Sequence, residues 1–374
     1  MGPLNGIRIV EIAGIGPGPM AAMLLADLGA SVLRVDRPDV VEAARQGADR
    51  PHMTSGRPML GLDLKSADGR EQARHVIAAA DVLLEGFRPG VMERLGLGPD
   101  DCHRDNPGLV YARMTGWGQE GPLAQRAGHD VNYIALTGAL HSFGRRDSAP
   151  VPPANLVGDF GGGGMLVVTG ILSALVERQG SGTGQVVDAA MVDGSALLLS
   201  MMHEDRGRGS WSDERGTNYL DTGAPWYDVY ECADGGYVSV GAIEPQFYAQ
   251  LLAGLGLADA ELPDQWDAQR WPELRERFAA VLSGRTRDEW ADIFGDTDAC
   301  VQPVLTLEEA ATHPHLAQRG TVRHADGQVW AGPAPRFSRT PGAATRDPAA
   351  TAPSVAETLA AWGIPDAVDG TTAT

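Results

Sequence analysis

The sequence predicts an α/β protein of two domains. Its 374 residues exceed one ordinary domain, and a content of 43% hydrophobic and 21% charged residues is that of a globular protein. The first half alternates short apolar segments with helical patterns, which is typical of a parallel sheet covered by helices. Near residue 226 the pattern changes to alternating residues around a glycine turn, which indicates a separate α+β domain.

The larger domain is predicted to be Rossmann-like. Its first strand, IRIVEI, precedes a turn rich in glycine and proline, and a helix follows that turn. Strands and helices then alternate up to an apolar helix that begins after four glycines. We expect strands over residues 7–12, 31–35, 81–85, 109–113 and 185–189, helices over residues 19–28, 65–80 and 164–178, and a further helix through Met201.

The smaller domain is expected to combine a hairpin with helices. WYDVYE and YVSVGA flank the turn CADGG, and helical patterns follow over residues 246–252, 271–282 and 287–294. A capping-box pattern of Ser354 and Glu357 predicts one last short helix. The expected boundaries are a large domain over residues 1–185, completed by about 330–365, a small domain over 225–315, linkers at 186–224 and 316–329, and a disordered tail at 366–374.

Composition excludes several classes of partner. A net charge of −19 argues against nucleic acid, and apolar runs such as residues 164–176 fall short of the ~20 residues that span a bilayer. Cys102, Cys232 and Cys300 are scattered without the spacing of metal ligands, so we expect no metal site and a reducing, cytoplasmic environment. An anionic ligand would need local arginines and backbone N–H groups.

The first turn has the outline of a dinucleotide site but lacks its third glycine. The turn reads GIGPGP, and Pro19 occupies the position of that glycine. Asp36, which would hold a ribose hydroxyl, lies between Arg34 and Arg37, and this arrangement suits a phosphate-rich ligand better. The turn therefore disfavours NAD. The alternative is a domain whose glycines merely turn the chain.

An ordered set of segments resembles the family III coenzyme A transferases, within them the α-methylacyl-CoA racemase branch. The likeness runs in register over about residues 4–340. A histidine in GHD together with the glutamate of GAIEP favours the racemase branch over the transferases. The segments are IRIVEIAGIGPGPMAAMLLADLGASVLRVDRP, LDLKS, DVLLEGFRPGVMERLGLGP, YARMTGWGQEGP, AGHDVNY, NLVGDFGGGG, GQVVDAAMVDG and GAPWYDVYECADGGYVSVGAIEPQFY.

The resemblance implies that three residues catalyse inversion of the carbon next to a thioester. Inversion needs one group that removes the α-proton, another that returns a proton to the opposite face, and donors for the enolate oxygen. By resemblance, His129 and Asp159 serve the two faces, and Glu244 pairs with the histidine. From the residues alone, His129 could be a structural histidine, Asp159 a helix cap and Glu244 a first-turn acid.

The resemblance also implies where coenzyme A, as part of the substrate, would bind without any prosthetic group. Arg37 and Arg88 are the main phosphate or adenine candidates, and Arg34 and Arg57 are weaker ones. The four glycines after Asp159 would let bulky ligand atoms approach the main chain, and their N–H groups could stabilise the enolate. The other contact residues are Leu62, Asp63, Leu64, Lys65, Gly128, Asp130 and Tyr133, with Asp130 more plausibly orienting its loop.

Members of this family are interlocked dimers, so the resemblance also implies a homodimer whose site is shared between chains. Thr222, in LDTGAP, replaces a common glycine, and TSGRPM at residues 54–59 replaces a more basic stretch.

Two alternative functions stay open. One is a coenzyme A transferase with Asp159 as nucleophile, and the other is a non-catalytic protein that binds acyl-CoA. The acyl chain is left open by the sequence.

Overall fold

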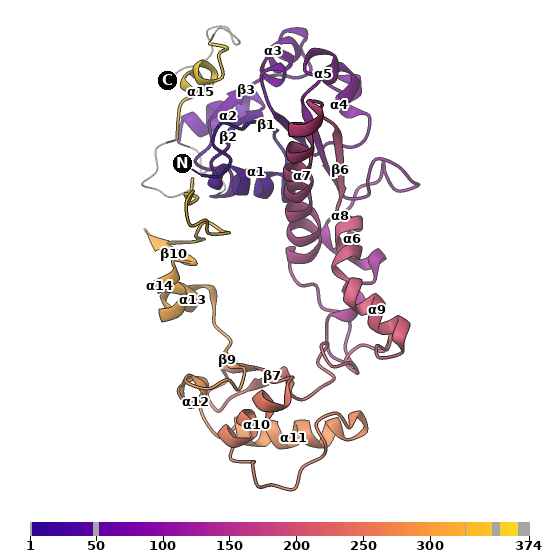
Figure 1. Cartoon of the computed structure of the whole chain (residues 1–374), viewed down its shortest axis with the longest axis vertical. Helices are drawn as coiled ribbons and strands as arrows, with labels where there is room; N and C mark the ends of the chain where they lie inside the picture. Colours follow the sequence, from indigo (N-terminus) through magenta and orange to yellow (C-terminus); the bar gives the residue numbers. More distant parts are fainter. Residues whose placement is uncertain (1, 48–51, 326, 346–351, 366–374) are drawn as a thin grey trace. The chain divides into compact units, whose positions relative to one another are not determined.

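The computed structural model describes residues 2–47, 52–325, 327–345 and 352–365, which fall into two compact units (Figure 1). Unit 1 contains the described residues up to Thr137, residues 154–198 and those from Gly320 onward. Unit 2 contains residues 138–153 and 199–319. The expected tail at 366–374 lies outside the described residues.

Unit 1 is built on a six-stranded parallel sheet with the strand order β3-β2-β1-β4-β5-β6. The order reverses direction between β1 and β4, as in doubly wound dinucleotide-binding folds. This confirms the predicted fold class. The strands are β1 (Arg8–Ile12), β2 (Ser31–Asp36), β3 (Met59–Gly61), β4 (Val82–Glu85), β5 (Val110–Thr115) and β6 (Val186–Ala190).

Helices cover both faces of this sheet because successive strand residues point to opposite sides. Ile9 and Val82 pack with α1 and α7 in one core, whereas Val10 and Leu83 pack with α3 and α5 in the other. The α-helices of unit 1 are α1 (Pro17–Asp27), α2 (Pro38–Arg45), α3 (Ala67–Ala78), α4 (Val91–Arg94), α5 (Pro99–Asp105), α6 (Asp130–Thr137), α7 (Met165–Ser181), α8 (Met191–Leu198) and α15 (Val355–Ala361).

The last helix returns to the sheet as a cap on the second core. Ser354 and Glu357 form the predicted capping box at the start of α15. Leu359 is buried in the core, and the indole N–H of Trp362 donates to the Ser31 hydroxyl at 2.9 Å. Unit 1 also contains the π-helix η3 (Leu156–Gly164), the 3₁₀ turn η1 (His52–Thr54) and the hairpin β10 (Val322–Ala325) with β11 (Gln328–Ala331).

Residues 156–181 form one continuous helical stretch because η3 runs directly into α7. Its length and mean hydropathy would suffice to cross a membrane. From the sequence we had considered only the apolar run of residues 164–176, which is too short for this. However, α7 lies against β5 and β6 and contributes Val167, Ile171 and Ala174 to the first core. This packing is that of a core helix of an α/β domain.

Unit 2 is an α+β unit around the antiparallel sheet β7-β8-β9. The predicted hairpin is present, and β9 adds a third strand to it. Trp226, Phe278 and Trp290 lie in its core. The elements of unit 2 are η2 (Leu140–Ser142), α9 (Ser200–Arg208), β7 (Tyr227–Glu231), β8 (Tyr237–Gly241), α10 (Pro245–Gly254), η4 (Ala268–Arg270), α11 (Trp271–Leu282), α12 (Arg287–Phe294), β9 (Val301–Pro303), α13 (Leu307–Thr312) and α14 (Pro314–Arg319).

The boundaries between the units differ from the predicted ones. Residues 186–224 are not a linker, because β6 pairs with β5 along its whole length and α8 packs on η3. Residues 316–329 contain the end of α14 and the β10–β11 hairpin. Residues 138–153, which we expected in the large domain, belong to unit 2, where Arg145 forms an ion pair of 2.7 Å with the buried Asp228.

Candidate active site

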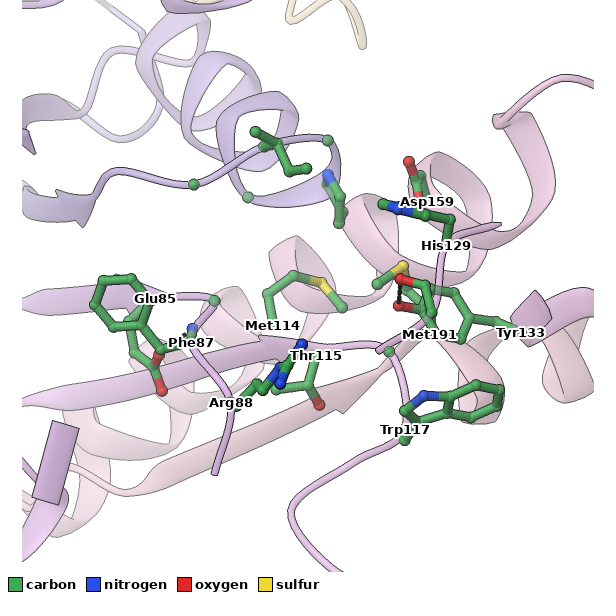
Figure 2. Close-up of a pocket in the computed structure, with 18 of the residues that line it drawn as sticks. Glu85, Phe87, Arg88, Met114, Thr115, Trp117, His129, Tyr133, Asp159 and Met191 are labelled. Atoms are coloured by element: carbon green, nitrogen blue, oxygen red, sulfur yellow. Dashed lines mark hydrogen bonds between the residues drawn. The ribbon is translucent and has the colours of Figure 1, made fainter. Parts of the chain in front are cut away.

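A cavity of about 690 Å³ lies at the carboxyl ends of β1, β4 and β5 (Figure 2). This is the edge at which open parallel sheets bind ligands, next to the reversal of strand order. The turn before α1 forms one wall and the FRPG loop after β4 forms another. Met53, Met114 and Met191 add flexible apolar surface, so the cavity suits a ligand with an apolar part.

His129 and Asp159 both line this cavity, and Figure 2 shows the two labelled side chains next to each other. His129 directly precedes α6, and its side chain is exposed. Its backbone is held by Asn132, because the His129 N–H donates to the Asn132 side chain at 3.0 Å and the His129 carbonyl accepts from the Asn132 N–H at 2.8 Å. The imidazole therefore stands on a fixed backbone.

The Asp159 carboxyl group is half-buried and has a perturbed proton affinity. Burial raises the pKa of Asp159, and the negative charge of Asp130 raises it further, whereas the amide of Asn155 and the charge of His129 act in the opposite direction. The Asn155 amide donates to Asp159 Oδ2 at 3.2 Å, and the Asp159 backbone N–H donates to Asp130 Oδ2 at 2.7 Å. Asp159 is thus a positioned carboxylate with a pKa nearer to neutrality, as a general base requires.

The glycines after Asp159 serve packing rather than ligand approach, which corrects our expectation. A Cβ on Gly162 would lie 2.7 Å from the Ser195 backbone nitrogen, and a Cβ on Gly194 would lie 1.8 Å from the Gly162 carbonyl oxygen. Gly163 and Gly164 pack equally closely against Met191 and Met20. Residues 160–164 are not among those that line the cavity, so their N–H groups do not face a ligand there.

Three of the predicted binding residues, Arg88, Gly128 and Tyr133, line the cavity. The Tyr133 hydroxyl donates to the Gly128 carbonyl, and the Trp117 ring packs edge-on against Tyr133 with centroids 4.8 Å apart. A Cβ on Gly128 would lie 2.8 Å from the Tyr133 ring and 3.0 Å from the Trp117 ring, so the loop before His129 needs glycine here.

The other predicted binding residues lie outside the cavity lining. Arg37 is exposed and pairs with Asp39 at 3.2 Å. Asp130 is buried and bonds to the Asp159 backbone, so it orients the loop. The four residues that follow β3 have other partners: the Leu62 side chain is buried in the core, Leu64 packs against that core, and Asp63 accepts a hydrogen bond of 2.9 Å from the Lys65 N–H.

Arg34 and Arg57 were weaker candidates and are structural. Both guanidinium groups are buried and form ion pairs with Glu11, and the Arg57 Nε–Glu11 Oε2 distance is 3.1 Å. Arg34 also holds Asp36 at 3.0 Å. Because Arg34 already binds the Asp36 carboxylate, Asp36 does not hold a ribose hydroxyl. This agrees with the incomplete glycine fingerprint of the first turn.

Sequence reasoning missed two charged residues of the cavity, Glu85 and Arg126. Glu85 ends β4, and the carboxyl end of a parallel strand is itself a positional signal. Arg126 lies three residues before His129, where no periodic pattern distinguishes it.

A family model of CoA-transferase family III matches residues 4–354. The chain belongs to CoA-transferase family III. An alpha-methylacyl-CoA racemase of Mus musculus is 49% identical over 349 residues, which cover 92% of this chain and 90% of the relative. One of Homo sapiens is 47% identical over 348 residues, with the same two shares. The crystal structure of a CAIB/BAIF family protein from Brucella suis superposes with a TM-score of 0.78 at 26% identity and covers 96% of this chain and 98% of its own.

The third predicted catalytic residue, Glu244, belongs to unit 2. It follows β8 and is the N-cap residue of α10, as the predicted strand-to-helix junction requires. Its side chain is exposed, and it is close enough to Cys300 to raise the pKa of that thiol together with burial, which is the larger cause.

Thr222 has a backbone conformation that favours glycine, the residue that the resemblance leads us to expect at this position. Its φ of +77° lies in the left-handed region, which threonine rarely adopts. Arg275 donates to the next carbonyl, that of Gly223, at 2.8 Å and fixes this turn in unit 2. Threonine at this position therefore introduces backbone strain into the turn.

Proposed function

We propose that this protein is an α-methylacyl-CoA racemase, which inverts the carbon next to the thioester of 2-methyl-branched acyl-CoA. The observation that carries the proposal is one cavity that presents both His129 and Asp159, with the pKa of Asp159 raised. The identity to racemases over most of both chains supports the same reaction.

The chemistry needs only proton transfer. Asp159 removes the α-proton from one face, the Cα–H electron pair moves into the thioester to form an enolate, and protonated His129 delivers a proton to the opposite face. In the other direction the two residues exchange roles. The reaction has no net change in protons or electrons, so it needs no prosthetic group beyond the coenzyme A of the substrate.

The enolate is stabilised by the helix that follows His129. We assign this role to α6 because it begins at Asp130, directly after His129, and the N-terminus of a helix carries a partial positive charge that stabilises a developing oxyanion. This assigns to α6 the role that we first expected of the glycine run.

Substrate binding combines the cationic and apolar parts of the cavity. Arg88 and Arg126 offer guanidinium groups to the phosphates of coenzyme A, which a protein of net charge −19 must attract locally. Met53, Met114 and Met191 accommodate the acyl chain. The free thiols of Cys102, Cys232 and Cys300 fit the cytoplasmic location that we propose.

We further infer a homodimer in which Glu244 of one chain pairs with His129 of the other. Supporting this assembly, α6, η3, α7 and α8 expose large apolar side chains on elements that pack together in unit 1. Such a surface is typical of an interface. Its side chains are Leu136, Leu156, Met165, Val176, Leu197 and Leu198.

The decisive experiment is incubation of a single epimer of a 2-methylacyl-CoA in D₂O without an acceptor acid. We expect both epimers, with deuterium at the α-carbon. Thioester that stays unexchanged across a panel of branched substrates would contradict the proposal. Transfer of coenzyme A to an added carboxylate, with release of the 2-methyl acid, would instead support a coenzyme A transferase with Asp159 as nucleophile. Binding without either reaction would indicate a non-catalytic acyl-CoA-binding protein.

A further inference from the structure

One guanidinium group joins the two sides of the FRPG loop (residues 87–90). Arg113 on β5 faces Glu85, the last residue of β4, with 3.7 Å between Nε and Oε1. The same group forms an ion pair with Glu93 on α4, the helix that follows the loop. Glu85 and Arg113 are only 4% and 8% exposed, so this arrangement is largely shielded from solvent.

Further hydrogen bonds fix the loop between these acids. The Phe87 N–H donates to Glu85 Oε2 at 2.7 Å, and the Gln125 amide donates to the Pro89 carbonyl at 3.0 Å. Arg113 Nη1 also donates to Gln119 at 2.6 Å, and its Cζ lies 5.2 Å from the centre of the Tyr111 ring. The guanidinium is therefore held by partners on several elements.

Arg88 lies in the middle of this fixed loop and differs from its neighbours. Its side chain is exposed and lines the cavity, and Figure 2 shows it between the FRPG loop and the residues around Thr115. A fixed backbone lowers the entropy cost of binding an anion, because only the Arg88 side chain, and not the loop, then has to be ordered. A buried carboxylate such as Glu85 would repel phosphate directly, so its role is to hold the loop.

We propose that Glu85, Arg113 and Glu93 form a clamp that positions Arg88 to bind the phosphates of the acyl-coenzyme A substrate. The inference rests on the proposed function, because it assumes a coenzyme A ligand. The clamp residues are positioning residues that act through Arg88.

The clamp is expected to weaken as the pH falls. Burial raises the pKa of Glu85 to about 7, against the opposing effects of the Phe87 N–H and of Arg113, while Glu93 and Asp188 add to the rise. Protonation below that pH removes the negative charge that attracts Arg113 and weakens acceptance from the Phe87 N–H. Substrate affinity should thus be highest above pH 7 and fall on acidification.

A double-mutant cycle with Glu85→Gln and Arg88→Gln tests the clamp. Racemisation gives KM and kcat, and calorimetry gives the affinity for coenzyme A alone. We expect each single variant to raise KM about tenfold, the effect of one lost charged hydrogen bond, with a much smaller change in kcat. The double variant should resemble Arg88→Gln alone, because Glu85 acts through Arg88.

The pH profile provides a readout that a merely structural role would not change. Between pH 6 and 8 the KM of the wild type should decrease, and in Glu85→Gln this dependence should be flatter, while titration of the substrate phosphates is common to both. Two outcomes would overturn the clamp. One is a double variant whose increase in KM is the product of the two single increases, and the other is a Glu85→Gln protein with the KM and pH profile of the wild type.

Two further variants keep the result interpretable. Arg74→Gln removes the exposed ion pair with Asp105 between α3 and α5, neither residue of which lines the cavity, and should leave KM unchanged. If Glu85→Gln loses cooperative thermal unfolding, the test uses Glu93→Gln instead, because the Glu93 side chain is half-exposed and its replacement should disturb folding less. A raised KM in this variant supports the clamp, and an unchanged KM contradicts it. A wild type that neither binds coenzyme A nor exchanges deuterium refutes the proposed function itself.

Discussion

Asp130 accepts a hydrogen bond of 2.7 Å from the backbone N–H of Asp159, so the residue after the candidate histidine holds the candidate carboxylate. The two residues are 29 positions apart, Asp130 at the start of α6 and Asp159 within η3. A Cβ on Gly158 would lie 2.6 Å from Asp130 Oδ2, so glycine before Asp159 permits this approach. The contact ties the backbones of both candidate residues to one junction between α6 and η3.

Replacement of Asp130 by asparagine should shift the pH dependence of racemisation. The charge of Asp130 raises the pKa of Asp159, so its removal lowers that pKa, and the carboxylate remains a base at lower pH. The acidic limb of the kcat/KM profile should therefore shift to lower pH, by about one pH unit or less. An acidic limb that stays at the same pH or shifts to higher pH would show that the charge of Asp130 does not raise the pKa of Asp159. Asp68→Asn, on the exposed side of α3, is the matched control and should not move it.

The two-base assignment predicts unequal damage to the two directions. His129→Ala and Asp159→Asn should each reduce epimerisation by about 10²–10⁴-fold, the usual contribution of a general acid or base. Deuterium exchange measured separately from each epimer should be impaired to different extents, because each residue serves one face. His75→Ala, at an exposed histidine of α3, should behave as wild type. Full activity of His129→Ala would make that histidine structural.

The proposed shared site predicts complementation between inactive chains. Asp159→Ala chains that are refolded together with Glu244→Ala chains should form heterodimers with one doubly damaged and one intact site. Random pairing makes about half of the dimers mixed, so roughly a quarter of wild-type activity should return if the sites are independent. Mixing the folded variants should restore little, because interlocked chains do not exchange. Verified heterodimers without activity would place all three residues on one chain.

Thr222→Gly should stabilise unit 2. Removal of the Cβ relieves the left-handed backbone at φ +77°, for which about 1 kcal/mol is expected, partly offset by the greater freedom of glycine in the unfolded chain. Chemical denaturation should show a higher midpoint at the same m-value. Thr217→Gly, at a neighbouring threonine without positive φ, should lower the midpoint. The same decrease in both variants would show that the turn at Thr222 is not strained.

The sequence alone determined most of the architecture, because local patterns encode it. Alternating apolar segments located the strands of the large sheet, and Ser354 with Glu357 marked the start of α15. The strand β3 was missed because three residues are too few to show a period, and the helix α6 was missed because some of its apolar residues, Val131 and Leu136, are exposed and obscure the pattern. His129 and Asp159 were found through their motifs, and the cavity brings both together.

Only the tertiary structure decided what the arginines and glycines do. Arg57 and Arg88 both directly precede a proline, and both were binding candidates, Arg57 the weaker. A buried Glu11, 46 residues away, holds Arg57 in the core, whereas Arg88 lines the cavity. The glycines after Asp159 match a ligand-binding loop, but α8 fills the space beside them. Charge and backbone freedom are properties of a residue, whereas the partner that uses them is set by long-range packing, which no local pattern records.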